Sequence, residues 1–168
     1  MNIFLIHPTT RNIGNDVITY ATAQLLYSVF GQDANIVNIP ALEGHQFGGL
    51  VPRQIYDINR FADCVVLGGG NLFENGQITY NAHAVEALRP PMLLLGLSHG
   101  RIMSRRDELE ERTDSLRADA IRHLVGRSVA ALVRDHASQA ILRDLGAPTE
   151  VGGCPTLFLE PNEEQTES

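Results

Sequence analysis

Residues 62 to 76 read ADCVVLGGGNLFENG, and this stretch decides the fold class. The apolar run from Cys64 to Leu67 is typical of a fully buried strand, and three glycines follow it directly. Glycines at the end of such a strand let a ligand or another backbone approach closely, and they accept either sign of φ. The stretch therefore predicts a buried strand that ends either against a ligand or in a tight turn without one.

The same alternation of apolar runs and helical segments extends along the chain. Strands are expected at 2–7, 35–39, 64–70, 92–97, 129–133 and 149–159. Helices are expected at 16–30, 53–60, 78–88 and 105–126, with another after Asp135 as its N-cap. In the first helix, Val17, Ala21, Leu25 and Val29 recur at helical spacing. This order predicts the α/β class: a Rossmann-like, doubly wound, mostly parallel sheet with helices on both faces.

Length and charge limit the kind of protein. The 168 residues fit one domain, expected at 1–160, with a polar acidic tail or the start of a linker at 161–168. A net charge of -7 argues against a nucleic acid or an anionic membrane surface as the main partner. All 13 basic residues are arginines, so neither a P-loop lysine nor a Schiff base is available.

The sequence has no long apolar segment and no metal-binding motif. No segment approaches the roughly 20 apolar residues that span a bilayer, and the first residues, MNIFLIHP, are too short for a signal peptide. We therefore expect a soluble, cytoplasmic protein that does not span a membrane. Cys64 and Cys154 form no C-x-x-C pair, and the histidines show no H-E-x-x-H spacing, so no metal site is expected.

The first loop, HPTTRNIGNDVI, places polar groups at the start of a helix. Asn12, Gly14, Asn15 and Asp16 lie there, and the positive end of a helix suits an anionic ligand. The alternative is a capping loop whose side chains bond the helix's own free N–H groups. The G-x-G-x-x-G fingerprint is absent, which disfavours a dinucleotide-dependent enzyme.

The other loops at the carboxyl ends of the strands add further candidates. Gly68, Gly69 and Gly70 are followed by Asn71, which supplies a donor and an acceptor, and by Glu74, which supplies a carboxylate. The alternative to a ligand site is a tight strand-to-helix turn.

His99, in GLSHG, follows the fourth strand and titrates near neutral pH, so it is a candidate acid or base. Arg134 follows the fifth strand as a candidate anion clamp, with a structural Arg134–Asp135 pair as its alternative.

Four segments in this order resemble the polysaccharide pyruvyl transferase family. They are NIGNDVI at 12–18, ADCVVLGGGNLF at 62–73, ALVRDHASQAILRDLG at 131–146 and VGGCPTLFL at 151–159. The resemblance extends from Asn2 to Leu159. Positions that recur in the family are Asn12, Gly14, Gly68 to Asn71, Arg134–Asp135 and the Cys154–Pro155 turn. The family's first loop usually reads Asn-x-Gly-Asp, whereas here Asn15 takes the acidic place and Asp16 follows it.

The resemblance implies an architecture similar to two-domain glycosyltransferases, with the active site between two Rossmann-like halves. This chain would supply the N-terminal half, and a second domain, a partner chain or a homo-oligomer would complete the site. The family transfers a pyruvyl group from phosphoenolpyruvate to a hydroxyl pair of a saccharide, which forms a ketal. It implies phosphoenolpyruvate as donor substrate, no cofactor, and a saccharide or lipid-linked saccharide as acceptor.

Roles for the candidate residues follow from this resemblance. His99 and Asp16 are the candidates for proton relay. The substrate-binding candidates are Asn12, Gly14, Asn15, Gly68, Gly69, Gly70, Asn71 and Arg134. The alternative function is a catalytically inactive single-domain module that binds a nucleotide, sugar or phosphate at the glycine loop. Activity that depends on phosphoenolpyruvate would distinguish the two functions.

Overall fold

The computed structural model describes residues 1–9, 12–42, 48–103, 109–110 and 113–159. Its main sheet has six parallel strands in the order β2-β1-β3-β4-β7-β8. They are β1 (Asn2–His7), β2 (Asn35–Pro40), β3 (Cys64–Gly70), β4 (Met92–Leu97), β7 (Ala130–Val133) and β8 (Glu150–Val151). The Rossmann-like, doubly wound α/β class predicted from the sequence is confirmed.

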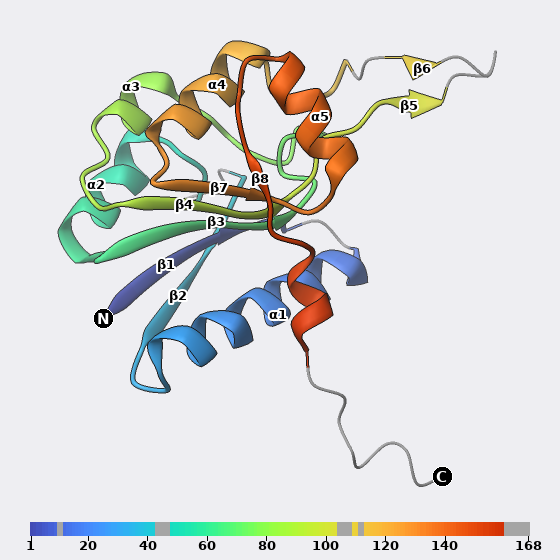
Figure 1. The fold of residues 1–168 in the computed structure, drawn as a ribbon. Helices are drawn as coiled ribbons and strands as arrows, with labels where there is room; N and C mark the ends of the chain where they lie inside the picture. Colours follow the sequence, from blue (N-terminus) through green and yellow to red (C-terminus); the bar gives the residue numbers. More distant parts are fainter. Residues whose placement is uncertain (10–11, 43–47, 104–108, 111–112, 160–168) are drawn as a thin grey trace, which may run out of the picture.

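Helices cover the two faces of the sheet unequally (Figure 1). One face is covered by α1 (Ile13–Phe30) and the short 3-10 helix η1 (Pro155–Phe158). The other carries α2 (Pro52–Phe61), α3 (Ala82–Glu86), α4 (Ala118–Arg127) and α5 (His136–Asp144). The larger hydrophobic core lies beneath these four helices, and a smaller one, built around Ile3, Leu5 and Leu26, lies beneath α1.

The strand order has a switch point at the carboxyl edge of the sheet. β1 lies between β2 and β3, and the chain leaves β1 into α1 on one face but leaves β3 toward α3 on the other. Loops that diverge in this way leave a gap outside the strand ends, where open α/β sheets bind ligands. The loops after β1 and β3, which carry candidate site residues, lie at this switch point.

The close approach of α1 to β3 explains two of the three glycines. A Cβ atom at Gly68 would lie 2.4 Å from Leu5 Cδ1 and 3.1 Å from Thr22 Cγ2. A Cβ atom at Gly69, where φ is +74°, would lie 2.1 Å from Ile18 Cγ2. Carbon atoms pack at about 3.5–4.0 Å, so a side chain at Gly69 would push α1 away from the sheet, and one at Gly68 would displace the Leu5 side chain of β1 and crowd Thr22. The glycines are therefore required by helix packing before any ligand is considered.

The buried face of α1 differs from the stripe that the sequence predicts. Ala21 of that stripe is buried, but Val17 and Val29 are 43% and 66% exposed. Thr22 and Leu26 are buried instead. The helix is turned so that its side chains meet the bare glycine backbone of β3, which apolar spacing alone does not reveal.

Three further predictions were wrong in extent. The helix expected at 105–126 is the shorter α4, and a small antiparallel pair, β5 (Ile102–Met103) with β6 (Leu109–Glu110), precedes it. Residues 105–108 and 111–112 of that prediction, and the tail at 161–168, lie outside the described residues. The helix expected at 78–88 is only α3, and the strand expected at 149–159 is β8 followed by η1.

Replacing Gly69 by alanine tests the packing of α1. We expect Gly69→Ala to lower the free energy of unfolding by about 2–4 kcal/mol, from the unfavourable φ and from overpacking. Ile18 is β-branched and stiff within a helix, so it cannot swing aside. Gly76→Ala is the matched control, because Gly76 has φ +57° and no atom within 4 Å of its Cβ position. It should lose only about 1–2 kcal/mol in urea denaturation. Equal losses in both variants would contradict the packing argument.

Candidate functional site

Backbone hydrogen bonds align the loops that leave β3, β4 and β7. The Ser98 N–H donates to the Gly70 carbonyl at 2.8 Å, and the Arg134 N–H donates to the Leu97 carbonyl at 2.8 Å. The glycine loop, the GLSHG loop and the Arg134–Asp135 loop therefore leave the sheet side by side, at the edge where the sequence predicts the site.

The first loop is mainly occupied with starting α1. Asn12 is the N-cap, and its side-chain oxygen accepts a hydrogen bond from the Gly14 N–H at 2.9 Å. Asn15 is buried in the first turn, with its side-chain oxygen 3.3 Å from the position of a Cβ atom at Gly70. The capping interpretation therefore holds for Asn12. Asn15 connects this loop to the end of the glycine strand.

Asp16 lies apart from the other catalytic candidate. It is exposed in the first turn of α1, and within the described residues its carboxylate makes no hydrogen bond or ion pair. Its proton-relay role stays a prediction. Asn71 is half-buried at the start of the turn after β3, where its carbonyl accepts the Glu74 N–H at 2.9 Å.

A buried acid and a buried histidine meet between the β3 and β4 loops. Glu74 and His99 are only 8% and 9% exposed, and Glu74 Oε1 lies 3.9 Å from His99 Nδ1. The same carboxylate oxygen accepts a hydrogen bond from the Gly100 N–H. The pairing of Glu74 with His99 was missed from the sequence, because 25 positions of chain separate the two residues.

Two serines also hold the GLSHG loop. The Ser98 hydroxyl donates to the Gly70 carbonyl at 3.3 Å, so it is not directed at the imidazole of His99. The buried Ser138 hydroxyl accepts the His99 N–H at 3.1 Å, which ties this loop to α5. The sequence analysis did not predict this role of Ser138. Hydrogen bonds to β3, through Ser98, and to α5, through Ser138, thus hold the backbone around His99.

Arg134 and Asp135 form the structural pair that was the alternative to an anion clamp. The Arg134 Nε donates to Asp135 Oδ2 at 3.2 Å, and both side chains are about 40% exposed. Asp135 Oδ1 also accepts the Ser138 N–H at 2.7 Å, so Asp135 is the N-cap of α5. Burial alone would raise the pKa of Asp135, but the bonds from Ser138 and the Arg134 charge outweigh it and lower that pKa. The Arg134 guanidinium remains partly exposed at the edge of the sheet.

A cavity of about 250 Å³ opens beside His99. Its walls come from the GLSHG loop, the segment before α4, and α5. The lining residues are His99, Gly100, Arg101, Ser115, Leu116, Arg117, Ala118, Ile141 and Leu145. The sequence analysis placed residues 115–118 inside a long helix, so it did not predict this cavity.

A second histidine cluster joins α3 to α4. The His123 Nε2 lies 2.8 Å from Glu86 Oε2, and its Nδ1 lies 2.6 Å from the Tyr80 hydroxyl. An ionised carboxylate cannot donate, so Nε2 carries the proton and Nδ1 accepts from Tyr80 when the ring is neutral. Hydrogen bonding to His123 lowers the pKa of Glu86, and burial raises that of Tyr80. This cluster clamps two helices together on the face opposite α1.

The described residues form neither a metal site nor a disulfide. Within the described ranges, no three His, Cys, Asp or Glu side chains converge as a metal site. Cys64 and Cys154 are free and half-buried, and burial, followed by the Asp63 charge, raises the pKa of the Cys64 thiol. None of the helices in the described part of the chain has the length and apolarity to cross a bilayer.

Comparison with known families identifies the family to which the chain belongs. A family model for polysaccharide pyruvyl transferase matches residues 12–168. Because the match covers nearly the whole chain, the protein belongs to the polysaccharide pyruvyl transferase family. No curated protein and no solved structure matches the chain. The resemblance drawn from the four segments is therefore confirmed at the level of the family.

The cap at Asp135 gives a stability prediction with a defined pH dependence. At pH 7, Asp135→Ala should lower the free energy of unfolding by about 1 kcal/mol, because the α5 cap is lost. Asp135→Asn should lose less, because asparagine caps nearly as well.

The folded pKa of Asp135 lies below its unfolded value of about 3.9, so the carboxylate stabilises the fold above that pH. This contribution disappears as the pH falls through the folded pKa. Urea denaturation between pH 6 and pH 2.5 should therefore show the wild type converging with Asp135→Asn. A constant difference across this range would contradict the assignment.

Proposed function

We propose that this chain forms the donor-binding half of a pyruvyl transferase that uses phosphoenolpyruvate and a saccharide acceptor. The observation that carries the proposal is the buried Glu74–His99 pair beside a cavity at the carboxyl edge of the sheet. Membership of the polysaccharide pyruvyl transferase family supports the reaction class. A second Rossmann-like half, in the same polypeptide or on a partner chain, would complete the site.

The proposed reaction converts two saccharide hydroxyls and phosphoenolpyruvate into a pyruvate ketal and inorganic phosphate. Both hydroxyl oxygens form bonds to C2 of the donor, and the bond from C2 to the phosphate oxygen breaks. One hydroxyl proton moves to the methylene carbon, which becomes a methyl group, and the other leaves with the phosphate. The enzyme must therefore accept a proton, deliver a proton and offset the charge of an anionic donor.

His99 is the residue we assign to proton transfer. Positioned acid–base groups contribute typically about 10²–10⁴-fold to rate. The His99 Nδ1 faces Glu74, and the His99 side chain borders the cavity, which is where a substrate would meet it. Glu74 is a positioning residue in this proposal, since it acts through the imidazole. Asp16 is the second candidate for proton relay.

Arg134 is assigned to the charge of the donor. Its guanidinium is 41% exposed and lies next to the GLSHG loop through the Leu97 hydrogen bond. Guanidinium groups recognise phosphate and carboxylate with paired, charge-assisted hydrogen bonds. The pair with Asp135 would hold the Arg134 side chain in place for this role.

Cavity size favours a small donor over a nucleotide. Pockets for drug-sized ligands have volumes of about 300–1,000 Å³, and the cavity beside His99 has about 250 Å³. A three-carbon phosphorylated acid suits that volume, whereas a nucleotide needs more. This argues against the nucleotide form of the alternative binding module.

The test uses the full polypeptide together with any second domain or partner chain. Phosphoenolpyruvate is mixed with hexose-terminated oligosaccharides, and phosphate release is measured beside the new ketal methyl signal in proton NMR. Arg134→Ala should lower turnover by about 10²–10³, the usual loss for one group that stabilises developing charge. Arg143→Ala is the control, since Arg143 is exposed in the last turn of α5, whereas Arg134 follows the carboxyl end of β7.

The outcomes separate the two functions. Full activity in Arg134→Ala would remove the role assigned to that residue. Binding of phosphoenolpyruvate in ³¹P NMR without turnover would favour the inactive binding module. The absence of both phosphoenolpyruvate binding and turnover would contradict the proposed function itself.

A further inference from the structure

One side of α1 is apolar and exposed. Ile13, Val17 and Tyr20 follow one another at the spacing of a single helix face, and they are 81%, 43% and 59% exposed. The helix packs on β3 through its other side, where Ile18 and Thr22 meet the glycines. The exposed stripe is therefore turned away from the core of its own domain.

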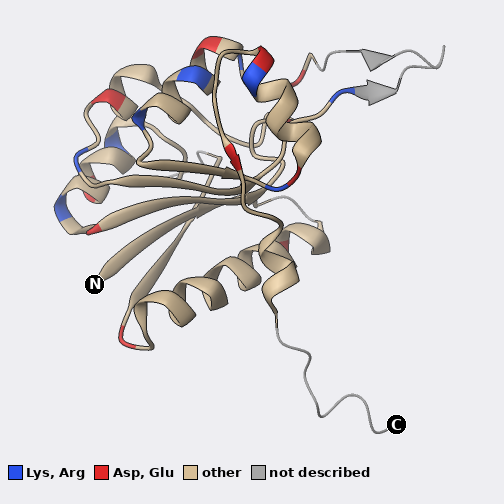
Figure 2. Cartoon of the chain, in the orientation of Figure 1, with Lys and Arg blue, Asp and Glu red and all other residues tan. Residues whose placement is uncertain are grey.

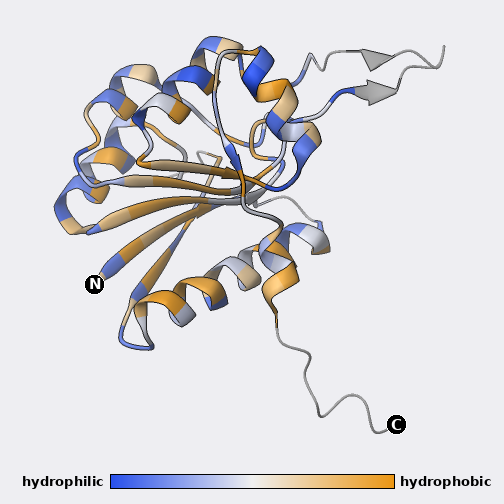
Figure 3. Cartoon of the chain, viewed as in Figure 1, coloured by the Kyte–Doolittle hydropathy of each residue, from blue (hydrophilic) through white to orange (hydrophobic). Residues whose placement is uncertain are grey.

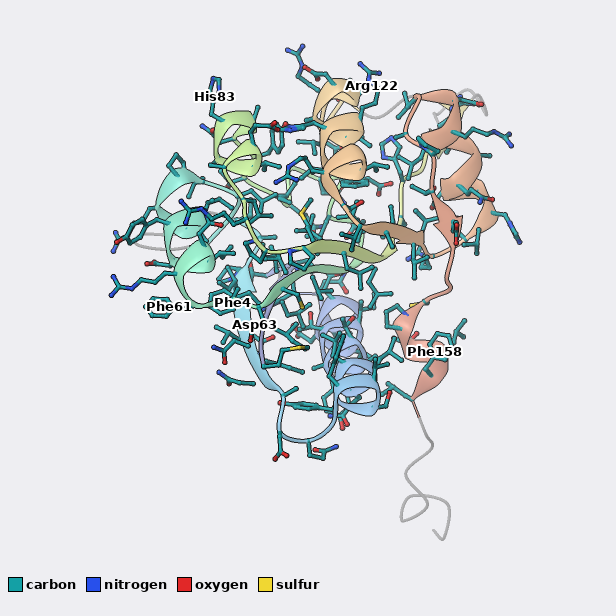
Figure 4. All side chains as sticks on the ribbon, turned by 60° about the vertical axis from the view of Figure 1, so that its left-hand side comes forward. Phe4, Phe61, Asp63, His83, Arg122 and Phe158 are labelled. Carbon is teal, nitrogen blue, oxygen red and sulfur yellow. The ribbon has the colours of Figure 1, made fainter. Side chains whose placement is uncertain are left out.

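The short helix η1 extends this apolar surface. It packs against α1, and its Leu157 and Phe158 are 76% and 58% exposed (Figure 4). Pro155 anchors η1 to the sheet, since its ring lies 2.6 Å from the position of a Cβ atom at Gly96. We call the surface formed by Ile13, Val17, Tyr20, Leu157 and Phe158 the α1–η1 face.

This face carries almost no charge. Asp16 is the one charged residue among the 18 of α1, and η1, with the sequence PTLF, has none. Arginines and acids gather instead on the helices of the opposite face (Figure 2). In Figure 3, orange hydrophobic segments of α1 alternate with paler and blue ones, and η1 is largely orange.

We propose that the α1–η1 face is the contact surface of a two-fold homodimer of this chain. Two copies that each carry a net charge of -7 repel one another, so they associate best where charge is sparse. In an antiparallel pair of α1 helices centred on Tyr20, the two Asp16 residues lie about 12 Å apart along the axis. That separation exceeds the Debye length of about 8 Å at physiological salt, so their repulsion is screened.

The charge distribution disfavours other occupants. The segment that follows Leu159, EPNEEQTES, is polar and acidic and offers no apolar side chains to cover the face. An interfacial membrane helix relies on Lys and Arg around its apolar stripe, and α1 and η1 have neither. A charged protein surface would lose its hydration against this face without gaining partners. A second copy presents the same uncharged apolar surface.

Sedimentation equilibrium of the chain over a range of concentrations tests the proposal without any measurement of activity. The wild type should approach twice the 18.4 kDa of the chain. Tyr20→Glu should raise the dimer dissociation constant at least about tenfold, as expected for a buried aromatic contact. Leu157→Ser, on the other helix of the face, should weaken the dimer in the same direction.

Val29→Glu is the matched control. Val29 is 66% exposed on the same helix, but it lies nine residues from Tyr20 and therefore about half a turn away around the axis. It should leave the dissociation constant unchanged, and circular dichroism should show all three variants folded. A wild type that stays monomeric overturns the proposal and points to a different partner. Equal effects of Val29→Glu and Tyr20→Glu, or a dimer indifferent to both Tyr20→Glu and Leu157→Ser, overturn it as well.

Discussion

The contact between α1 and the bare backbone of β3 is the constraint on which the rest of the structure depends. Gly68 and Gly69 admit Thr22 and Ile18 at distances that no side chain would allow. This depth of packing brings the start of α1 to the strand ends, where Asn15 lies against Gly70. It also fixes the rotation of the helix, which leaves Val17 and Tyr20 facing outward.

Much of the architecture was predictable, because buried parallel strands are continuous apolar runs. The limits of β4 match the predicted range, and Asp135 caps α5 as predicted. The rotation of α1 was not predictable, since a helix with one charged residue offers no polar face to contrast with its apolar ones. The prediction of a long helix at 105–126 was wrong for a different reason. Residues 114–116 bond to the turn after β3 through the Asp114 carbonyl and the Leu116 N–H, and local sequence does not encode such distant partners.

In the candidate site, too, the local features could be predicted from the sequence and the contacts between distant residues could not. The loops that hold His99 and Arg134 begin where β4 and β7 end, and the ends of these strands could be predicted from the sequence. The contacts around His99 join residues from three separate loops, with Glu74 on one side and Ser138 on the other. Only the register of β3, β4 and β7 places them together.

Most acceptor groups at the carboxyl edge already serve the chain's own backbone. Asn12 and Asp135 cap helices, and Glu74 accepts the Gly100 N–H. The described side chains that border the cavity and carry N–H or O–H groups are His99, Arg101, Ser115 and Arg117, of which Arg117 pairs with Asp119. A cavity whose described lining includes Arg101 and Arg117 and no carboxylate is matched to an anion rather than to a neutral sugar. This is the physical reason for assigning the donor, and not the saccharide acceptor, to this half of the proposed transferase.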